Sequence, residues 1–253
     1  MNHTTLEQLR HEIYDCFEQG ADALFNLADA LLCESQAQSL PELSLSPFFE
    51  RKWPSVYEAL EDGQINVERL RSVLVKTLLA QRADNEPIWI AVDASNIERP
   101  AAPTSADRGM IHLSNLPLVD KPISVGWQFS NVVLLPEQPS SWTAMLDQRR
   151  ISTQETPIQV AIAQLRDLRP LFGRRRVIVV ADRGYCSAAF LRACHELGYS
   201  VLSPPQKRSQ ALPSWGAPPQ TGTLPQRWSS VSRQTPRNSW ASRASLLRAG
   251  RQG

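Results

Sequence analysis

Two short apolar segments, each followed directly by an aspartate, constrain the fold of this chain more than any other feature. Residues 88–92 precede Asp93, and residues 177–181 precede Asp182. Each segment is too short for a helix and rich in β-branched residues, so each predicts a buried strand. Strands that are apolar on both faces belong to sheets covered by helices, and ligand sites lie at their carboxyl ends. We therefore expect Asp93 and Asp182 at the same edge of one α/β sheet.

The elements expected around these two strands follow one another in an informative order. Between the strands, alternating and β-branched residues predict a hairpin of two more strands, and helical spacing predicts a helix. A three-strand meander followed by crossovers is the layout of a ribonuclease-H-like mixed sheet flanked by helices. In such a sheet the first and fourth strands are neighbours, which places Asp93 beside Asp182. The expected elements are an irregular loop at 97–121, strands at 125–135 and 141–146, a turn at 136–140, helices through 158–168 and 190–198, and a last strand at 199–203.

Composition divides the chain into three segments. We expect a helical N-terminal subdomain at residues 1–84, a partial ribonuclease-H-like core at 85–203 and a tail at 204–253. Leucines and other apolar residues recur at helical spacing through residues 4–80, where Thr4 and Glu7 fit a capping box. A packed helical subdomain is one interpretation. A DNA-binding helix-turn-helix is the other, although no basic recognition face stands out.

The tail differs sharply from the rest of the chain in charge and apolar content. Residues 204–253 contain eight Lys or Arg, seven prolines, eight serines and no Asp or Glu. The first 203 residues therefore carry all 25 acids against 19 bases, a net charge of −6. Ordering a chain costs about 1–2 kcal/mol of backbone entropy per residue. Four leucines, one valine and three tryptophans do not offset that cost, so we expect a disordered tail.

Composition also excludes two classes of protein. No apolar stretch approaches the roughly 20 residues of a membrane span, and the N-terminus lacks a signal pattern, so we expect a cytoplasmic protein. The four cysteines are scattered without C-x-x-C spacing, which favours reduced thiols over a zinc site or disulfides.

The two aspartates have a structural and a chemical interpretation. A strand-end Asp often caps a turn or the next helix. Two carboxylates about 4 Å apart also repel by about 4 kcal/mol at an effective dielectric near 20, and a divalent ion between them removes that conflict. Hard oxygen ligands with room for water and phosphate suit Mg²⁺ or Mn²⁺. The pair Asp93 and Asp182 therefore predicts a metal site for phosphoryl transfer.

Asp93 after a buried strand, the Gly126-Trp127 strand and the motif Ala181-Asp182-Arg183-Gly184-Tyr185 resemble the DDE transposases of bacterial insertion sequences. The resemblance covers roughly residues 40–203. It implies a catalytic core that nicks transposon ends and joins the 3′ hydroxyls to target DNA. It further implies that Asp93 and Asp182 are catalytic acids and ligands of Mg²⁺ or Mn²⁺. The expected partner is DNA, and a homo-oligomer is compatible with this assignment.

This chain departs from the family pattern in its third acid. The family has an acid, usually Glu, on a helix well downstream of the second Asp. Here the last acid in the chain is Glu196, in the helix directly after the Asp182 strand, where a solvated role is expected. The abrupt change after Ser203 is therefore interpreted as a truncated or frameshifted gene, and the chain is expected to be inactive in transposition.

Two other functions stay open at this point. A haloacid-dehalogenase-type phosphatase also begins with a strand that ends in Asp, but it has a second Asp two residues later, where this chain has Ser95. A transposase remnant that only binds DNA or a partner is the non-enzymatic alternative. Metal-dependent nicking of DNA separates an active enzyme from such a remnant.

Overall fold

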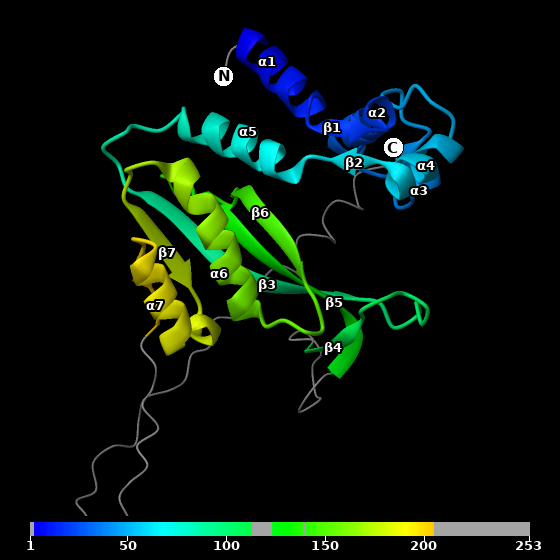
Figure 1. Cartoon of the computed structure of the whole chain (residues 1–253). Coiled ribbons are helices and arrows are strands. Elements are labelled where there is room, and N and C mark those ends of the chain that lie inside the picture. Colours follow the sequence, from blue (N-terminus) through cyan, green and yellow to red (C-terminus); the bar gives the residue numbers. More distant parts are fainter. Residues whose placement is uncertain (1–2, 113–122, 139, 205–253) are drawn as a thin grey trace, which may run out of the picture. The chain divides into compact units, whose positions relative to one another are not determined.

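The computed structural model describes residues 3–112, 123–138 and 140–204 (Figure 1). These residues belong to one compact unit, Met1–Lys207. The segment that precedes the large sheet is mostly helical, as expected, and a small antiparallel β-ladder joins its parts. Because α1 begins at His3, Thr4 lies inside the helix and the expected cap at Thr4 is wrong. The elements are α1 (His3–Tyr14), β1 (Phe17–Gln19), α2 (Ala21–Cys33), α3 (Leu40–Leu43), α4 (Pro54–Asp62), β2 (Gln64–Ile65) and α5 (Val67–Leu79).

A six-stranded mixed sheet forms the centre of the unit. Its strands are β3 (Ile88–Glu98), β4 (Gly109–His112), β5 (Ile123–Leu134), β6 (Ala144–Ile151), β7 (Val177–Ala181) and β8 (Ser200–Leu202). The order is β4-β5-β3-β7-β8, with β6 also paired to β5. β5 is antiparallel to β3 and β6, whereas β7 is parallel to β3 and β8. The meander β3-β5-β6 followed by parallel β7 and β8 is the ribonuclease-H-like arrangement, which confirms the expected fold class.

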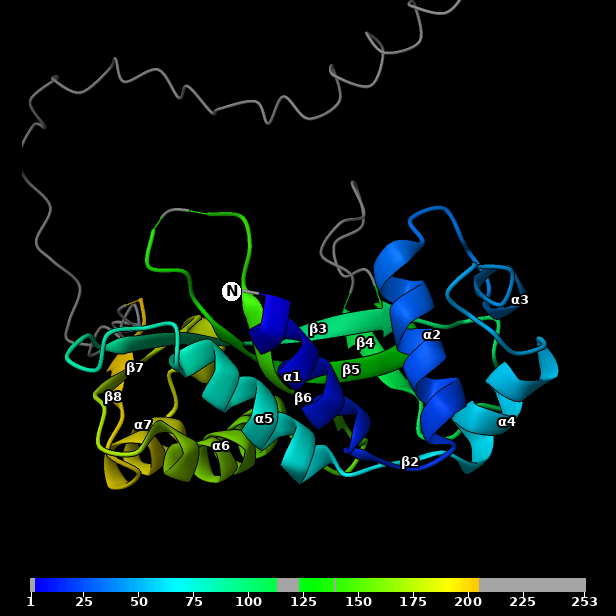
Figure 2. The ribbon, with the colours of Figure 1, turned by 90° about the horizontal axis from the view of Figure 1, so that it is seen from above.

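Three helices cover one face of this sheet. α5, α6 (Pro157–Leu168) and α7 (Ala188–Glu196) lie on the same side in both views (Figures 1 and 2). α6 begins sharply because Thr156 and Gln159 form a reciprocal capping box in front of Pro157. Two short 3₁₀ helices, η1 (Arg169–Phe172) and η2 (Arg183–Tyr185), flank β7. The core between helices and sheet includes Val75, Leu79, Ile88, Ile90, Val92, Val132, Leu134, Leu165, Leu168, Val177, Val179 and Phe190.

The other side of the sheet, here called the open face, carries the alternate residues Trp89, Ala91, Asp93 and Ser95 of β3. Successive side chains of a strand point to opposite sides, and those of Ile88, Ile90 and Val92 are buried under the helices. Trp89 is 38% exposed, and on β6 and β8 Met145 and Leu202 are 45% and 55% exposed. Asp93 therefore lies on the side of the sheet that the described helices leave accessible.

Three expected boundaries differ from the structure. The first strand does not end at Val92 but continues to Glu98, because β5 pairs with it as far as Glu98↔Gly126 after β7 has ended. The expected loop at 97–121 contains the end of β3 and all of β4, and its residues 113–121 lie outside the described part. The strand expected at 141–146 is β6 at Ala144–Ile151.

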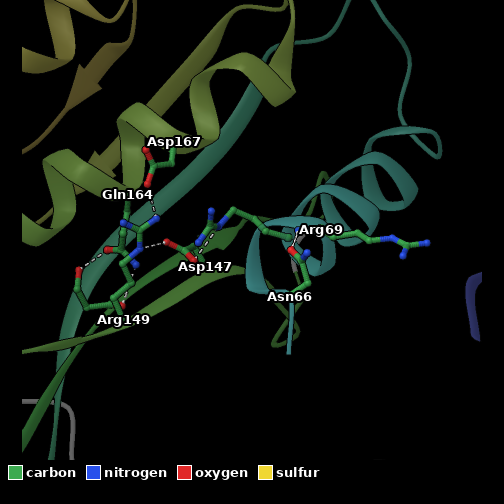
Figure 3. A network of polar contacts seen from close by, with 8 residues as sticks. Asn66, Arg69, Asp147, Arg149, Gln164 and Asp167 are labelled. Atoms are coloured by element: carbon green, nitrogen blue, oxygen red, sulfur yellow. Dashed lines mark hydrogen bonds and ion pairs between the residues drawn. The ribbon is translucent and has the colours of Figure 1, made fainter. Parts of the chain in front are cut away.

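β6 continues past the expected strand into a charged segment, Asp147–Arg150, whose side chains pair within the protein. Asp147 is buried in the strand, and its carboxylate accepts hydrogen bonds from Arg71 Nε of α5 at 2.9 Å and from Arg149 Nε at 2.8 Å. Arg149 also donates to Asp167 of α6 at 2.7 Å (Figure 3). This network, called the Asp147 network below, ties α5, β6 and α6 together. Its charges are satisfied by residues distant in sequence, so the local pattern of β6 does not look like a buried strand.

A second buried polar contact joins α6 to the middle of the sheet. Ser130 of β5 and Gln164 of α6 are both fully buried. The Ser130 hydroxyl donates to Gln164 Oε1 at 2.6 Å, and Gln164 Nε2 donates to the Ser130 carbonyl oxygen at 3.1 Å. Each side chain satisfies the other, as buried polar groups require.

Two expectations concern the chain as a whole. In the part that the structure describes, none of the helices has the length and apolar character needed to cross a membrane. The expected disorder of residues 204–253 falls, apart from Pro204, outside the described residues and stays a prediction. The division at residue 84 also stays a prediction, and α5, although expected within the N-terminal segment, contributes Val75 and Leu79 to the core of the sheet.

Candidate functional site

Asp93 lies in the middle of β3, at the residue where one of the two neighbouring strands ends. The parallel ladder with β7 ends at the pair Val92↔Ala181, whereas the antiparallel ladder with β5 continues with Asp93 opposite Asn131. The side chain is exposed on the open face. The sheet therefore holds the Asp93 backbone on one side and leaves space on the other, which suits a residue that must meet a ligand.

Asp182 is the residue directly after β7, and the local backbone fixes its carboxylate. It is the N-cap of η2, and its Oδ1 accepts a hydrogen bond from the Gly184 backbone N–H at 2.8 Å. A Cβ added at Gly184 would lie 3.0 Å from Asp182 Oδ1, closer than side chains normally approach. The glycine of the Asp-Arg-Gly-Tyr motif thus lets the backbone turn against the carboxylate, and Oδ2 remains available.

The register of β3 and β7 brings the two acids to one edge. Because Val92 and Ala181 are the last pair of the parallel ladder, Asp93 and Asp182 are the next residues on adjacent strands. The expected neighbourhood of the first and fourth strands is confirmed, while a shared ion stays a prediction. Within residues 3–112, 123–138 and 140–204, no group of three or more His, Cys, Asp or Glu side chains is arranged to hold a metal.

Tyr185, the last residue of the motif, is buried beside the two acids. It is 4% exposed, and its ring packs on Phe190 of α7 with centroids 5.4 Å apart. Burial first, and then the charge of Asp93, raise the pKa of Tyr185 to about 12, and Asp182 acts in the same direction. The nearby Ser130 hydroxyl lowers the pKa of Tyr185, although its own proton is donated to Gln164 Oε1.

The Tyr185 hydroxyl has no hydrogen-bond partner in the described part of the chain. A buried polar group without a partner is costly and calls for an explanation such as a water molecule or an ion. Here the hydroxyl lies near the edge at which Asp93 and Asp182 follow the last pair of the β3–β7 ladder. The sequence motif contained this residue, but only the structure places it inside the core.

A row of uncharged polar residues crosses the open face beside Asp93, and sequence reasoning missed it. Gln148 Nε2 of β6 donates to Asn131 Oδ1 of β5 at 2.8 Å. Asn131 Nδ2 in turn donates to Ser95 Oγ of β3 at 2.9 Å. These three residues are called the amide row below. They come from three strands, so the signal becomes visible only once the register of β3, β5 and β6 is known.

Two arginines of β6, Arg149 and Arg150, form ion pairs within the protein. Arg149 belongs to the Asp147 network. Arg150 forms an ion pair with Asp107 at 3.0 Å and lies over the ring of Trp127 at 5.3 Å. Both side chains therefore hold elements of the sheet in place.

One family model matches most of the chain. A family model described as "DDE superfamily endonuclease" matches residues 12–252, which extends past residue 203, where the motif resemblance was expected to end. A search of curated proteins gave no significant match.

Solved transposases resemble the chain at low identity. The piggyBac transposase synaptic complex with hairpin DNA is 8% identical with a TM-score of 0.35, covering 81% of this chain and 50% of that one. The Mos1 transposase paired-end complex with left transposon end is 16% identical with a TM-score of 0.26, covering 70% and 57%. The Mos1 mariner paired-end complex with Mn is 18% identical with a TM-score of 0.23, covering 69% and 56%. The chain thus spans 50% to 57% of the length of these proteins.

Proposed function

Because the chain belongs to the DDE superfamily endonucleases, we propose that its sheet is the catalytic core of a transposase that cuts DNA and transfers the freed 3′ end. One observation carries the proposal. The parallel ladder of β3 and β7 ends at Val92↔Ala181, so that Asp93 and Asp182 follow as neighbours at one edge. Two adjacent carboxylates can hold the metal ions on which phosphoryl transfer depends.

The residues at this edge fit a hard divalent ion, Mg²⁺ or Mn²⁺. Asp182 offers Oδ2 while Gly184 holds Oδ1, and Asp93 offers an exposed carboxylate. The unpartnered hydroxyl of Tyr185 supports the presence of water or an ion nearby. When bound, such ions activate the attacking hydroxyl and stabilise the leaving oxygen. Within the protein, Asp93 and Asp182 bind and orient, and η2 fixes the direction of the second carboxylate.

We propose further that this chain has little or no strand-transfer activity. The described residues lack a third acid at the site, and the sequence has no Asp or Glu after Glu196. Each 1.4 kcal/mol of lost transition-state stabilisation slows a reaction about tenfold, so weak binding of an ion lowers the reaction rate steeply. The same observation favours the second candidate function, a remnant that binds DNA without cutting it.

Metal binding tests the assignment of the two acids. Calorimetric titration with Mn²⁺ is expected to detect a site in the full chain that weakens at least about 100-fold in Asp93→Asn and in Asp182→Asn. Asp62→Asn, at the exposed end of α4, is the matched control and should leave the affinity unchanged. Equal Mn²⁺ affinity in Asp93→Asn and the unaltered chain would refute the proposed site.

Plasmid nicking and strand transfer with Mg²⁺ or Mn²⁺ test the activity itself. We expect neither reaction to proceed at an appreciable rate. Strand transfer by the purified chain that is lost in Asp93→Asn would overturn the claim of inactivity while supporting the site.

A further inference from the structure

The amide row keeps hydrogen-bond donors that its internal contacts do not use. Gln148 donates to Asn131, and Asn131 donates to Ser95, so one of the two acceptor positions of the Asn131 carbonyl oxygen is used within the row. The Ser95 oxygen accepts from Asn131 and keeps its own proton to donate. The second N–H groups of Gln148 and Asn131 are also uncommitted to each other. The row can therefore offer two N–H groups and one O–H group to a ligand that approaches the open face.

The position of the row places these donors next to the candidate site. Asn131 is the direct cross-strand partner of Asp93, and Ser95 follows Asp93 by two residues on the same side of β3. Directly opposed residues have Cβ atoms about 4.5–5.5 Å apart. With strands about 4.8 Å apart, the row from β3 to β6 crosses about 10 Å of the face.

The surroundings of the row favour an anionic ligand that only accepts hydrogen bonds. On the open-face side of β3, β5 and β6, the described residues are uncharged except Asp93 and Arg150. Asp93 is the residue to which the proposed function assigns an ion, and Arg150 is paired with Asp107. Phosphodiester oxygens accept hydrogen bonds and donate none, and polar side chains commonly contact them in protein–DNA complexes.

We propose that the amide row Gln148-Asn131-Ser95 binds the sugar-phosphate backbone of the DNA strand that flanks the phosphate at Asp93 and Asp182. This proposal rests on the proposed function, because the acids define which phosphate the row adjoins. The row acts as a positioning surface that reads no base sequence and holds the strand along the sheet.

Fluorescence anisotropy with a labelled mixed-sequence DNA duplex, and with its separated strand, tests the proposal in Mg²⁺ buffer. Asn131→Ala and Gln148→Ala are each expected to weaken binding about tenfold, the effect of one hydrogen bond to a charged acceptor. Because uncharged donors release no counterions, the slope of log affinity against log salt should stay the same. Ser200→Ala on the same face and Gln64→Ala on β2 are matched controls that should bind like the unaltered chain.

The alternative role of the row is to tie β3, β5 and β6 together. In that case the variants would lower the thermal midpoint and leave DNA affinity unchanged, which would overturn the proposal. A changed salt slope, or no DNA binding by the unaltered chain, would overturn it as well. Mn²⁺ titration of the same variants keeps the two proposals apart, since the row variants should retain the metal affinity that Asp93→Asn loses.

Discussion

The Asp147 network offers the sharpest test of how the fold is held together. The Asp147 side chain is 3% exposed, Arg71 is 10% exposed and Arg149 is 27% exposed. Asp147→Ala leaves two guanidinium groups facing each other, one of them almost fully buried. Removing one partner from a buried ion pair costs about 3–5 kcal/mol, because an uncompensated charge remains in the interior.

The other members of the network should cost less, in an order that the structure sets. Arg71→Met removes one donor but leaves Asp147 paired with Arg149, so we expect about 1–3 kcal/mol. Asp167 is 46% exposed, and its loss should cost about 0–1 kcal/mol, as for surface pairs. The triple variant Arg71→Met, Asp147→Leu, Arg149→Met replaces all three charges by apolar groups and should recover most of the loss.

Urea unfolding followed by circular dichroism measures these free energies of unfolding. The expected order of destabilisation is Asp147→Ala, then Arg71→Met, then Asp167→Asn. A loss below about 1 kcal/mol for Asp147→Ala, or a triple variant less stable than Asp147→Ala, would refute the reasoning that buried charge dominates here.

Three further predictions concern the Asp182 turn and the start of β5. Gly184→Ala should weaken Mn²⁺ binding in calorimetry about tenfold with little change in the thermal midpoint, because the new Cβ would lie 3.0 Å from Asp182 Oδ1. The pKa of Tyr185 is raised to about 12 from an ordinary value of 10.0, so the folded state holds its proton longer than the unfolded state does. Its contribution to stability is complete below pH 10 and falls by up to about 2.7 kcal/mol as the pH rises through 12. Tyr185→Phe should remove this part of the alkaline loss in urea titrations, while Cys194 and Tyr199, whose pKa values burial also raises, keep theirs. Gly126→Ala should destabilise the chain by about 1–3 kcal/mol in urea unfolding, because its Cβ would meet the Ile97 carbonyl oxygen.

The central sheet was predictable because its buried strands carry uninterrupted apolar runs. Residues 177–181 have no polar side chain, and turn residues follow them. The sequence therefore predicted both that β7 is a buried strand and where it ends. The adjacency of β3 and β7 then followed from the order of elements, which confines a meander with crossovers to few arrangements. The position of Asp93 beside Asp182 depends on these two facts alone.

The parts that sequence reasoning missed depend on partners far along the chain. β6 contains Asp147, whose charge is satisfied by Arg71, 76 residues earlier, and no local pattern reveals such a partner. The second half of β3 is mostly polar and is paired on one side only. It is a strand because the ladder with β5 continues to Glu98. Tertiary contacts therefore override the local preference at both places.

The two acids of the candidate site were predictable from the sequence, whereas the polar residues around them were not. The two apolar runs pointed to Asp93 and Asp182. Asn131 and Gln148 carry no signal of their own, since isolated amides in strands are common on solvated faces. The cross-strand pairs Asp93↔Asn131 and Asn131↔Gln148 are what group them.

The buried contact between Ser130 and Gln164 has a consequence for how α6 finds its place. The apolar stripe of α6 would bury similar area if the helix slid along β5 by one turn, about 5.4 Å. Such a slip would leave the Gln164 amide and the Ser130 hydroxyl without partners in the interior, at a cost of about 1–3 kcal/mol for each group. The pair thus favours one docking position of α6 on the sheet over positions shifted by a turn.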